Sequence, residues 1–376
     1  MSRARRRLLA LGLGVALTAV VLWAGNLWAR SQGFAAGLLF DDLTPPPEVG
    51  FVWLPDQRVE SPLGFTIEIN NLGLRDARTL TRERPADTLR VLCVGDSFTY
   101  GLATPPEDTF VARIEQMLVT RLAERGGSVP WGADRSVSAV QVLNAGVNGW
   151  NSCQEAAWME WVGTGLQPDL VIVGFVMNDV LPHAGMIAPR RFPGRSWMLR
   201  WPLYQWLRQE FRNRRLADEE DPRAQELRRI MNQQRGLIET SPSGSPESRR
   251  MWDDALACLA KLRRRCTELG VPSALVVFPS LPQMQRALRG QRPEPQVVLA
   301  DLSERVGFTH VDLLSAWAAA GEAALLESDK SHPSALGHRL TAEGIVAALD
   351  RDGLLGPLNE PPVPVPPAAD PQGTRR

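Results

Sequence analysis

The tripeptide Gly95-Asp96-Ser97 places a serine where it can act as a nucleophile. It closes the apolar run 89–95, which has the composition of a strand buried on both faces. In open α/β sheets, ligands bind beyond the carboxyl ends of the strands. A serine at this point can direct its hydroxyl and its own backbone N–H into a cleft. Ser97 is therefore the candidate nucleophile.

A serine nucleophile needs a general base and a group that orients this base. The chain has four histidines, and His332 follows Asp329 by three residues. The Asp329 carboxylate can accept the Nδ1–H of His332 within one local turn, which leaves Nε2 facing the serine. We interpret His338 as a surface or packing residue. We interpret His183 and His310 as structural, since neither has a nearby carboxylate at a suitable spacing.

Acyl transfer also requires hydrogen-bond donors for the oxyanion that develops on the substrate. A second apolar run leads into residues 144–149, and a third ends near Asn178. At the shared edge of a parallel sheet, the Gly149 N–H and the Asn178 amide can converge with the Ser97 N–H. Each segment alone also fits a simpler interpretation, in which Gly146 and Gly149 are turn glycines and Asn178 caps a helix.

The segments that must position these residues alternate between two patterns. Mainly apolar runs predict strands at 89–95, 137–143, 169–175 and 273–278, and the segment 309–313 is predicted as a fifth. Helical spacing predicts helices at 109–122, 154–162, 253–269 and 333–349. Strands that alternate with helices predict an α/β domain of three layers, α/β/α, with a mainly parallel five-stranded sheet. The alternating residues 65–70 predict a short, half-buried strand before it.

The N-terminus has the features of a membrane anchor. Four Arg residues precede the uncharged stretch Leu8 to Ala29, which is long enough to cross a bilayer core. The positive-inside rule leaves the N-terminus in the cytoplasm and the rest of the chain outside it. The run is long and ends in Leu27-Trp28, which favours an uncleaved signal anchor over a cleaved signal peptide. We expect a single-pass protein whose catalytic domain is periplasmic or extracellular.

Composition suggests the remaining boundaries. Residues 1–30 are the Arg-rich start and the transmembrane anchor, 31–60 are a juxtamembrane linker, and 61–354 are the main domain. Residues 183–250, rich in Arg and Trp, interrupt the alternation and are predicted to form a helical insertion. The Pro-rich residues 355–376 are predicted to be a disordered tail.

Charge and cysteine content exclude several classes of function. The chain has 42 basic and 42 acidic residues, so it offers no net field to a nucleic acid. Its cysteines lack a Cys-x-x-Cys spacing, and no ligand cluster predicts a metal or an organic cofactor. We interpret all four as buried free thiols, with one bridge such as Cys93–Cys153 as the alternative. Cys258 and Cys266 are about 12 Å apart on one predicted helix, too far to pair.

Four segments, in this order, resemble the sequence blocks of the SGNH (GDSL-type) hydrolase family. They are Gly95-Asp96-Ser97, residues 144–149, Asn178-Asp179 and Asp329-x-x-His332. The likeness covers 65–182 and 251–350, and the stretch around 91–101 is similar to the membrane-anchored or secreted bacterial branch. One position departs from the family pattern, since Val176 stands where a glycine is expected two residues before Asn178.

The resemblance implies a flavodoxin-like SGNH fold and catalysis through an acyl-serine intermediate. It assigns Ser97 as nucleophile, His332 as general base and Asp329 as the residue that orients the imidazole. It also implies an oxyanion hole formed by the Ser97 N–H, the Gly149 N–H and the Asn178 side chain. It implies no metal and no cofactor.

Three functions remain open at this point. The first is an esterase that removes acyl groups from a glycan or lipid of the cell envelope. The second is an O-acyltransferase for an exported polysaccharide, which needs a membrane partner to carry the acyl group. The third is a non-catalytic binding protein on a hydrolase fold, against which the set Ser97, Asp329 and His332 argues.

Aromatic residues with Arg between them occupy the predicted insertion at near-helical spacing. They are Trp197, Trp201, Tyr204, Trp206 and Phe211. We expect them to pack the insertion onto the main domain; the alternatives are stacking on sugar rings and contact with the lipid surface.

Overall fold

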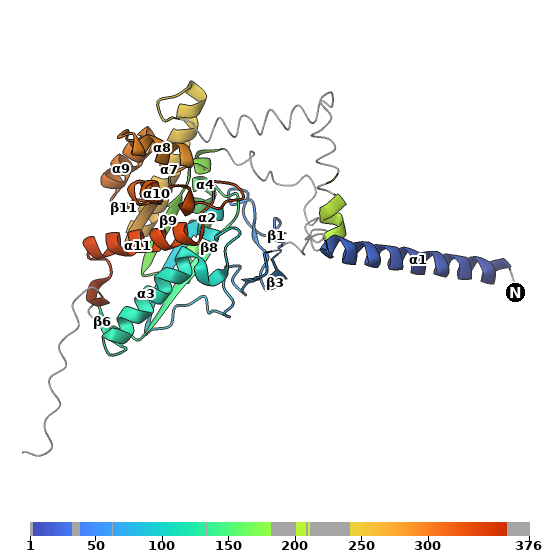
Figure 1. Ribbon diagram of the computed structural model, residues 1–376. Coiled ribbons are helices and arrows are strands. Elements are labelled where there is room, and N and C mark those ends of the chain that lie inside the picture. Colours follow the sequence, from blue (N-terminus) through green and yellow to red (C-terminus); the bar gives the residue numbers. More distant parts are fainter. Residues whose placement is uncertain are drawn as a thin grey trace, which may run out of the picture.

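The computed structural model describes residues 3–31, 38–61, 63–132, 134–181, 201–207, 210 and 241–358. Its centre is a parallel five-stranded sheet in the order β11-β10-β9-β5-β8 (Figure 1). These strands are β5 (Thr88–Gly95), β8 (Ala139–Gly146), β9 (Leu170–Phe175), β10 (Ser273–Val277) and β11 (Thr309–Asp312). The predicted five-stranded sheet is confirmed.

Helices cover both faces of the sheet and form two separate cores. One face packs against α3 (Phe110–Glu124), α8 (Leu281–Leu288), α10 (Leu314–Ala320) and α11 (Ala335–Arg351). The other packs against α4 (Ser152–Trp161), α7 (Pro246–Glu268) and α9 (Glu294–Val306). Because side chains alternate along a strand, Val91 and Cys93 enter the first core, and Leu92 and Val94 the second. This is the predicted three-layer α/β/α arrangement.

Local capping explains where several helices begin. The side chain of Thr109 accepts a hydrogen bond from Ala112 N at the start of α3. Ser245 caps α7 in the same way, and Pro246 occupies its first turn. α7 therefore begins seven residues before the predicted Asp253, inside the range assigned to the insertion. α8, α9 and α10 were not among the predicted helices. α9 lies in the crossover that parallel strands β10 and β11 require.

The short N-terminal strands pack on the domain. They are β1 (Phe40–Asp41), β2 (Val52–Trp53), β3 (Gln57–Glu60) and β4 (Thr66–Ile69). β4 matches the half-buried strand expected at 65–70. Trp53 is 3% exposed and donates from Nε1 to Gly146 O at 3.0 Å. The second half of the range expected to be a linker, 31–60, thus contributes residues to the core. Its apolar side chains cover the sheet at its edge strand, β8.

The other end of the domain also extends beyond its expected limit. Leu355 and Leu358 are each 1% exposed and belong to the α3–α11 core. The predicted disordered tail, 355–376, therefore begins with packed residues. Positions 359–376 lie outside the described residues, as does most of the predicted insertion, 183–250.

α1 (Arg3–Ser31) contains the apolar stretch Arg5–Ala29, with a mean hydropathy of 2.2 over its most apolar window. It is long and apolar enough to cross a membrane, as a span or as a signal sequence.

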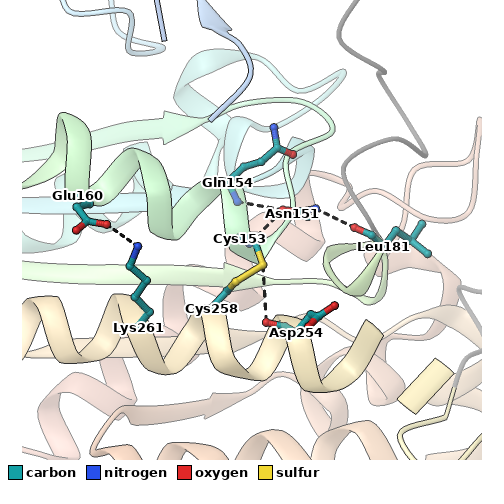
Figure 2. The surroundings of a disulfide bond; sticks show 8 residues. All are labelled: Asn151, Cys153, Gln154, Glu160, Leu181, Asp254, Cys258 and Lys261. Atoms are coloured by element: carbon teal, nitrogen blue, oxygen red, sulfur yellow. Dashed lines mark hydrogen bonds and ion pairs between the residues drawn. A yellow bond between two sulfur atoms is a disulfide. The ribbon is translucent and has the colours of Figure 1, made fainter. Parts of the chain in front are cut away.

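One disulfide joins α4 to α7, between Cys153 and Cys258, with Cα atoms 4.9 Å apart (Figure 2). The expectation of four free thiols was wrong for this pair and right for Cys93 and Cys266, which are buried and free. The alternative bridge, Cys93–Cys153, was also wrong. The reason is topological: the Cys93 side chain lies in the α3–α11 core, on the opposite face of the sheet from α4.

Candidate active site

The end of β5 and the short helix α2 (Ser97–Tyr100) present Ser97 at the carboxyl edge of the sheet. Asp96 caps this helix, since its Oδ1 accepts the Phe98 N–H at 2.8 Å. α2 lies so close to the sheet that a Cβ on Gly95 would be 2.1 Å from Thr99 Oγ1, and one on Gly146 would be 2.1 Å from Tyr100 N. Only glycine fits at these two strand ends.

Ser97, His332 and Asp329 form a continuous hydrogen-bond relay. Ser97 Oγ lies 2.9 Å from His332 Nε2, and His332 Nδ1 lies 2.6 Å from Asp329 Oδ2. A carboxylate can only accept, so Nδ1 carries the proton and Nε2 accepts from the serine hydroxyl. The spacing of Asp329 and His332 in the sequence thus produces the local turn that was expected.

Asp329 is held in its ionised form. Burial by itself raises the pKa of this carboxyl, but hydrogen bonds from the His332 ring and from the Ser331 and His332 backbone N–H groups outweigh it. The net result is a pKa below the ordinary value. A charged Asp329 stabilises the imidazolium that forms when His332 takes a proton.

The loop that carries these two residues is closed on itself. Leu326 N donates to His332 O at 2.8 Å, and Lys330 N donates to Leu326 O at 2.9 Å. Lys330 adopts a left-handed backbone with φ of 52°, an uncommon conformation for a residue with a side chain. The His332 ring also packs against Phe98, with ring centroids 5.0 Å apart. The imidazole is therefore fixed from both sides.

Asn178 reaches the same place from the end of β9. Its Nδ2 donates to Asp96 Oδ2 at 2.9 Å, and Ser97 Oγ lies 3.2 Å from that same oxygen. Val176, the departure from the family pattern, has φ of −125°, which any residue adopts. Its backbone N donates to Asp179 Oδ2 at 2.9 Å and fixes the turn. Glycine is therefore not needed there to bring Asn178 to the site.

Gly149 lies in the loop between β8 and α4. Val147 N donates to Gly95 O at 3.0 Å, which ties the start of this loop to the strand before Ser97. Trp150 N donates to Val147 O at 3.1 Å, closing a turn in which Gly149 has φ of 83°. This conformation explains a glycine by itself. The assignment of Gly149 to the oxyanion hole stays a prediction.

A cluster of three buried carboxyls was not predicted from the sequence, although two of its members, Asp96 and Asp179, belong to the motifs quoted above. Asp96, Glu155 and Asp179 are each at most 2% exposed. Burial raises the pKa of all three. The charge of Asp96 raises the pKa of Glu155 further, and the charges of Glu155 and Asp96 raise the pKa of Asp179 further. The sequence carried no signal for this cluster, because Glu155 comes from α4 and Asp179 from the segment after β9. Proximity arises only in the fold.

The other histidines lie apart from the relay. His338 is fully buried, and its Nδ1 accepts the Phe110 N–H at 3.2 Å, so of the two roles expected it has the packing role. His310 lies on β11 with its Nδ1 3.0 Å from Ser303 Oγ, in keeping with a structural role. His183 lies outside the described residues.

A pocket of about 270 Å³ opens beside Ser97 and His332. Its walls are mostly apolar, and Lys330 is the one lysine or arginine among its lining residues. The apolar lining is formed by Phe98, Val176, Met177, Phe278, Pro279, Leu281 and Pro282. Asn178, Ser280 and Ser331 complete it. The pocket can enclose a small apolar group next to the serine hydroxyl.

The model of the GDSL-like lipase/acylhydrolase family matches residues 93–340, about two thirds of the chain. The chain belongs to this family. No curated protein matches it significantly in sequence. The matched range contains every strand of the sheet except the first five residues of β5. It also contains both sequence segments that hold the relay. It is a family of ester-hydrolysing enzymes.

Several solved structures are similar to this GDSL-family chain. TesA shares 16% identity, with 69% of this chain and 97% of TesA covered and a TM-score of 0.39. A catalytic mutant of Axe2, an acetylxylan esterase from Geobacillus stearothermophilus, shares 18% identity over 69% and 93% of the two chains, with a TM-score of 0.42. LAE5, from the metagenome of Lake Arreo, Spain, shares 19% identity over 69% and 94%, with a TM-score of 0.37.

Proposed function

We propose that this protein is a serine esterase of the cell envelope in which Ser97 forms the acyl-enzyme. The observation that carries the proposal is the relay from Ser97 Oγ through His332 to Asp329, with both contacts at hydrogen-bond distance. Such an arrangement lets the imidazole take the serine proton as the oxygen attacks a carbonyl carbon. The family supplies the reaction class, and these three residues supply the mechanism.

In the first half of the reaction, the bond between Ser97 Oγ and the acyl carbon forms and the ester C–O bond breaks. His332 passes the serine proton to the departing alcohol. In the second half, water loses a proton to His332 as its oxygen bonds to the acyl carbon. The bond between this carbon and Ser97 Oγ then breaks, His332 returns the proton to Ser97 Oγ, and the acid is released. The Ser97 N–H, the Gly149 N–H and the Asn178 amide are the proposed donors to the oxyanion in both halves.

The pocket favours a short acyl group. Its volume, about 270 Å³, lies just below the range of roughly 300–1,000 Å³ usual for drug-sized ligands. Its apolar walls suit an alkyl chain and give no hydrogen bonds to a polar one. We therefore propose that the substrate is a small acyl ester of a glycan or lipid.

Two features support a location outside the cytoplasm. α1 is long and apolar enough for an anchor, and Arg residues precede its apolar stretch. The Cys153–Cys258 disulfide gives independent support, because disulfides persist in oxidising compartments and are rare in the cytosol. We propose that the domain after α1 is periplasmic or extracellular.

A fluorophosphonate probe on the full-length protein tests the proposal. We expect labelling of the wild type and none of Ser97→Ala. Ser331→Ala is the matched control, since this serine lines the same pocket but lies outside the relay, and it should label normally. Absence of labelling in a folded wild type would refute an activated serine and leave a binding role.

Turnover of acetyl esters, with and without an added polysaccharide, defines the acceptor. We expect acetate release to water as the main product. Acyl transfer to the polysaccharide faster than to water would instead identify an O-acyltransferase, which would need a membrane partner as acyl carrier.

A further inference from the structure

Residues 201–207 pack against the end of α1 nearest the domain (Figure 1). Trp206 meets Trp28 edge to face, with ring centroids 4.9 Å apart. Leu203 N donates to Asn26 Oδ1 at 3.3 Å. A Cβ on Gly25 would lie 3.0 Å from Leu203 Cδ2, so the lack of a side chain at Gly25 permits this approach. These contacts link a segment far along the chain to the apolar helix.

The position of these contacts along α1 sets their depth in a membrane. The apolar stretch Arg5–Ala29 has 25 residues, about 37 Å at helical rise, against about 30 Å for a hydrocarbon core. Its two ends therefore reach the headgroup layers. Residues 25–28 form the far end, and Trp23 and Trp28 suit the interfacial belt in which tryptophan gathers. Whatever packs on residues 25–28 lies at the same depth.

The segment itself has the chemistry of a bilayer interface. Trp201 is 43% exposed and Leu207 37% exposed, although both are large and apolar. The sequence from 197 to 215 alternates aromatic and aliphatic residues with Arg at 200, 208, 212, 214 and 215. Aromatic residues that enter the headgroup region, with Arg beside them to contact lipid phosphates, are typical of interfacial segments.

We infer that residues 201–207 are a second membrane contact, lying in the headgroup layer of the bilayer that α1 crosses. The partner is a phospholipid surface. The inference rests on the three contacts with α1 and on the exposed apolar residues beside them, and it is independent of the reaction at Ser97. Of the roles considered for Trp201 and Trp206, the inference favours contact with the lipid surface over the expected packing onto the main domain and over stacking on sugar rings.

This contact would hold the domain to the membrane at two places. Leu181 follows Asn178 by three residues, and its carbonyl accepts a hydrogen bond from the Asn151 side chain. Residue 201 follows Leu181 by roughly twenty residues. In sequence, the proposed membrane contact thus begins 23 residues after Asn178, which lines the pocket.

Site-specific fluorescence on the full-length protein tests the inference. The variant Leu207→Cys carries an environment-sensitive label in nanodiscs of phosphatidylcholine and phosphatidylglycerol. Its cysteine is selectively labelled, because Cys93 and Cys266 are buried and the other two form the disulfide. Leu288→Cys is the matched control, on α8 and 67% exposed. We expect lipids with a headgroup nitroxide to quench the label at 207 about threefold more than the control.

Equal quenching at positions 207 and 288 would overturn the membrane contact. A change in the fluorescence of the label at 207 on addition of a soluble acylated polysaccharide, with no quenching by the nitroxide lipids, would overturn the membrane contact in favour of sugar binding. The melting temperature of each labelled variant shows that the domain remains folded.

The seat on α1 has its own test. Gly25→Leu fills the space that Leu203 occupies, so it should reduce quenching at position 207 by half or more and leave the control at 288 unchanged. Gly14→Leu is the matched variant, since no atom lies within 4 Å of a Cβ at Gly14. Undiminished quenching in Gly25→Leu would overturn the seat of the segment on α1.

Discussion

The side-chain amide of Asn178 donates to the carboxylate of Asp96, the residue directly before Ser97, at 2.9 Å. This hydrogen bond joins the end of β9 to the cap of α2. Asp96 therefore has two tasks: it caps α2 through the Phe98 N–H, and it orients the amide proposed for the oxyanion hole. The same carboxylate fixes the positions of the proposed nucleophile and of one proposed donor relative to each other.

Replacement of Asn178 should slow chemistry more than binding. Asn178→Ala removes one proposed oxyanion donor, and we expect kcat to fall about 10²–10³-fold with little change in KM. Steady-state kinetics with an acetyl ester measure this. Asn71→Ala serves as control, because Asn71 bonds only to the Leu80 backbone away from the site. A large rise in KM with unchanged kcat would contradict the oxyanion role.

Replacement of Asp329 should impair the base without unfolding the domain. Asp329→Asn removes the charge that stabilises the His332 imidazolium, so we expect kcat to fall by up to about 10⁴-fold. Because Asp329 lies on the surface of the loop, the melting temperature of the variant should change little. Asp301→Asn is the control, on α9 and exposed. Retention of wild-type kcat in Asp329→Asn would show that another group orients the histidine.

Val176 should limit the length of the acyl chain. Its side chain lines the pocket where the family pattern has glycine, and its backbone conformation needs no glycine. Val176→Gly enlarges the pocket, so we expect the ratio of kcat/KM for hexanoyl over acetyl esters to rise about tenfold or more. Val140→Ala, buried in the sheet outside the pocket, should leave the ratio unchanged. An unaltered ratio in Val176→Gly would place the acyl chain elsewhere.

The disulfide should contribute strongly to stability. It closes a loop with a sequence separation of 105, so Cys153→Ser should lower the free energy of unfolding by about 2–5 kcal/mol. Urea unfolding under non-reducing conditions measures this difference, and a reductant should bring the wild type close to the variant. Cys266→Ser, the control, removes a buried free thiol and keeps the disulfide, so its stability should still fall when a reductant is added. A wild type unaffected by reductant would mean that the bridge adds no stability.

His338 should make the domain less stable in acid. Burial, with the charges of Arg75, Arg113 and His332, lowers its pKa to about 3, against 6.5 for the free side chain. Between these values the unfolded chain binds the proton more readily than the folded one, so stability falls as pH decreases. The contribution is complete above about pH 6.5 and is lost toward pH 3, by a few kcal/mol at most.

Urea unfolding at several pH values compares the wild type with His338→Gln. We expect the wild type to lose more free energy of unfolding between pH 7 and pH 4 than the variant does, because glutamine has no proton to gain. Parallel pH profiles would show that other groups dominate acid unfolding.

Patterns within the sequence were enough to predict the sheet and the relay. Mainly apolar runs marked β5, β8, β9 and β10, because a strand buried on both faces has few polar positions. The shorter β11, Thr-His-Val-Asp, carries a weaker signal of this kind. Asp329 and His332 were readable because three residues of one turn bring their side chains together without help from the rest of the fold. Ser97 and Asn178 were readable because parallel strands deliver their carboxyl ends to one edge. All of these signals are local, or follow from strand direction.

Contacts between segments far apart in the chain became apparent in the folded domain and could not be predicted from the sequence. The partner of Cys153 depends on α4 and α7 packing on one face of the sheet, and no spacing of cysteines encodes it. For the same reason, the buried carboxyls of Glu155 and Asp179 come close enough that the charge of Glu155 raises the pKa of Asp179. The early residues around Trp53 enter the core because a sheet edge there needs cover. The contact of Leu203 with Gly25 is another such link, because the missing side chain at Gly25 leaves the space that Leu203 occupies.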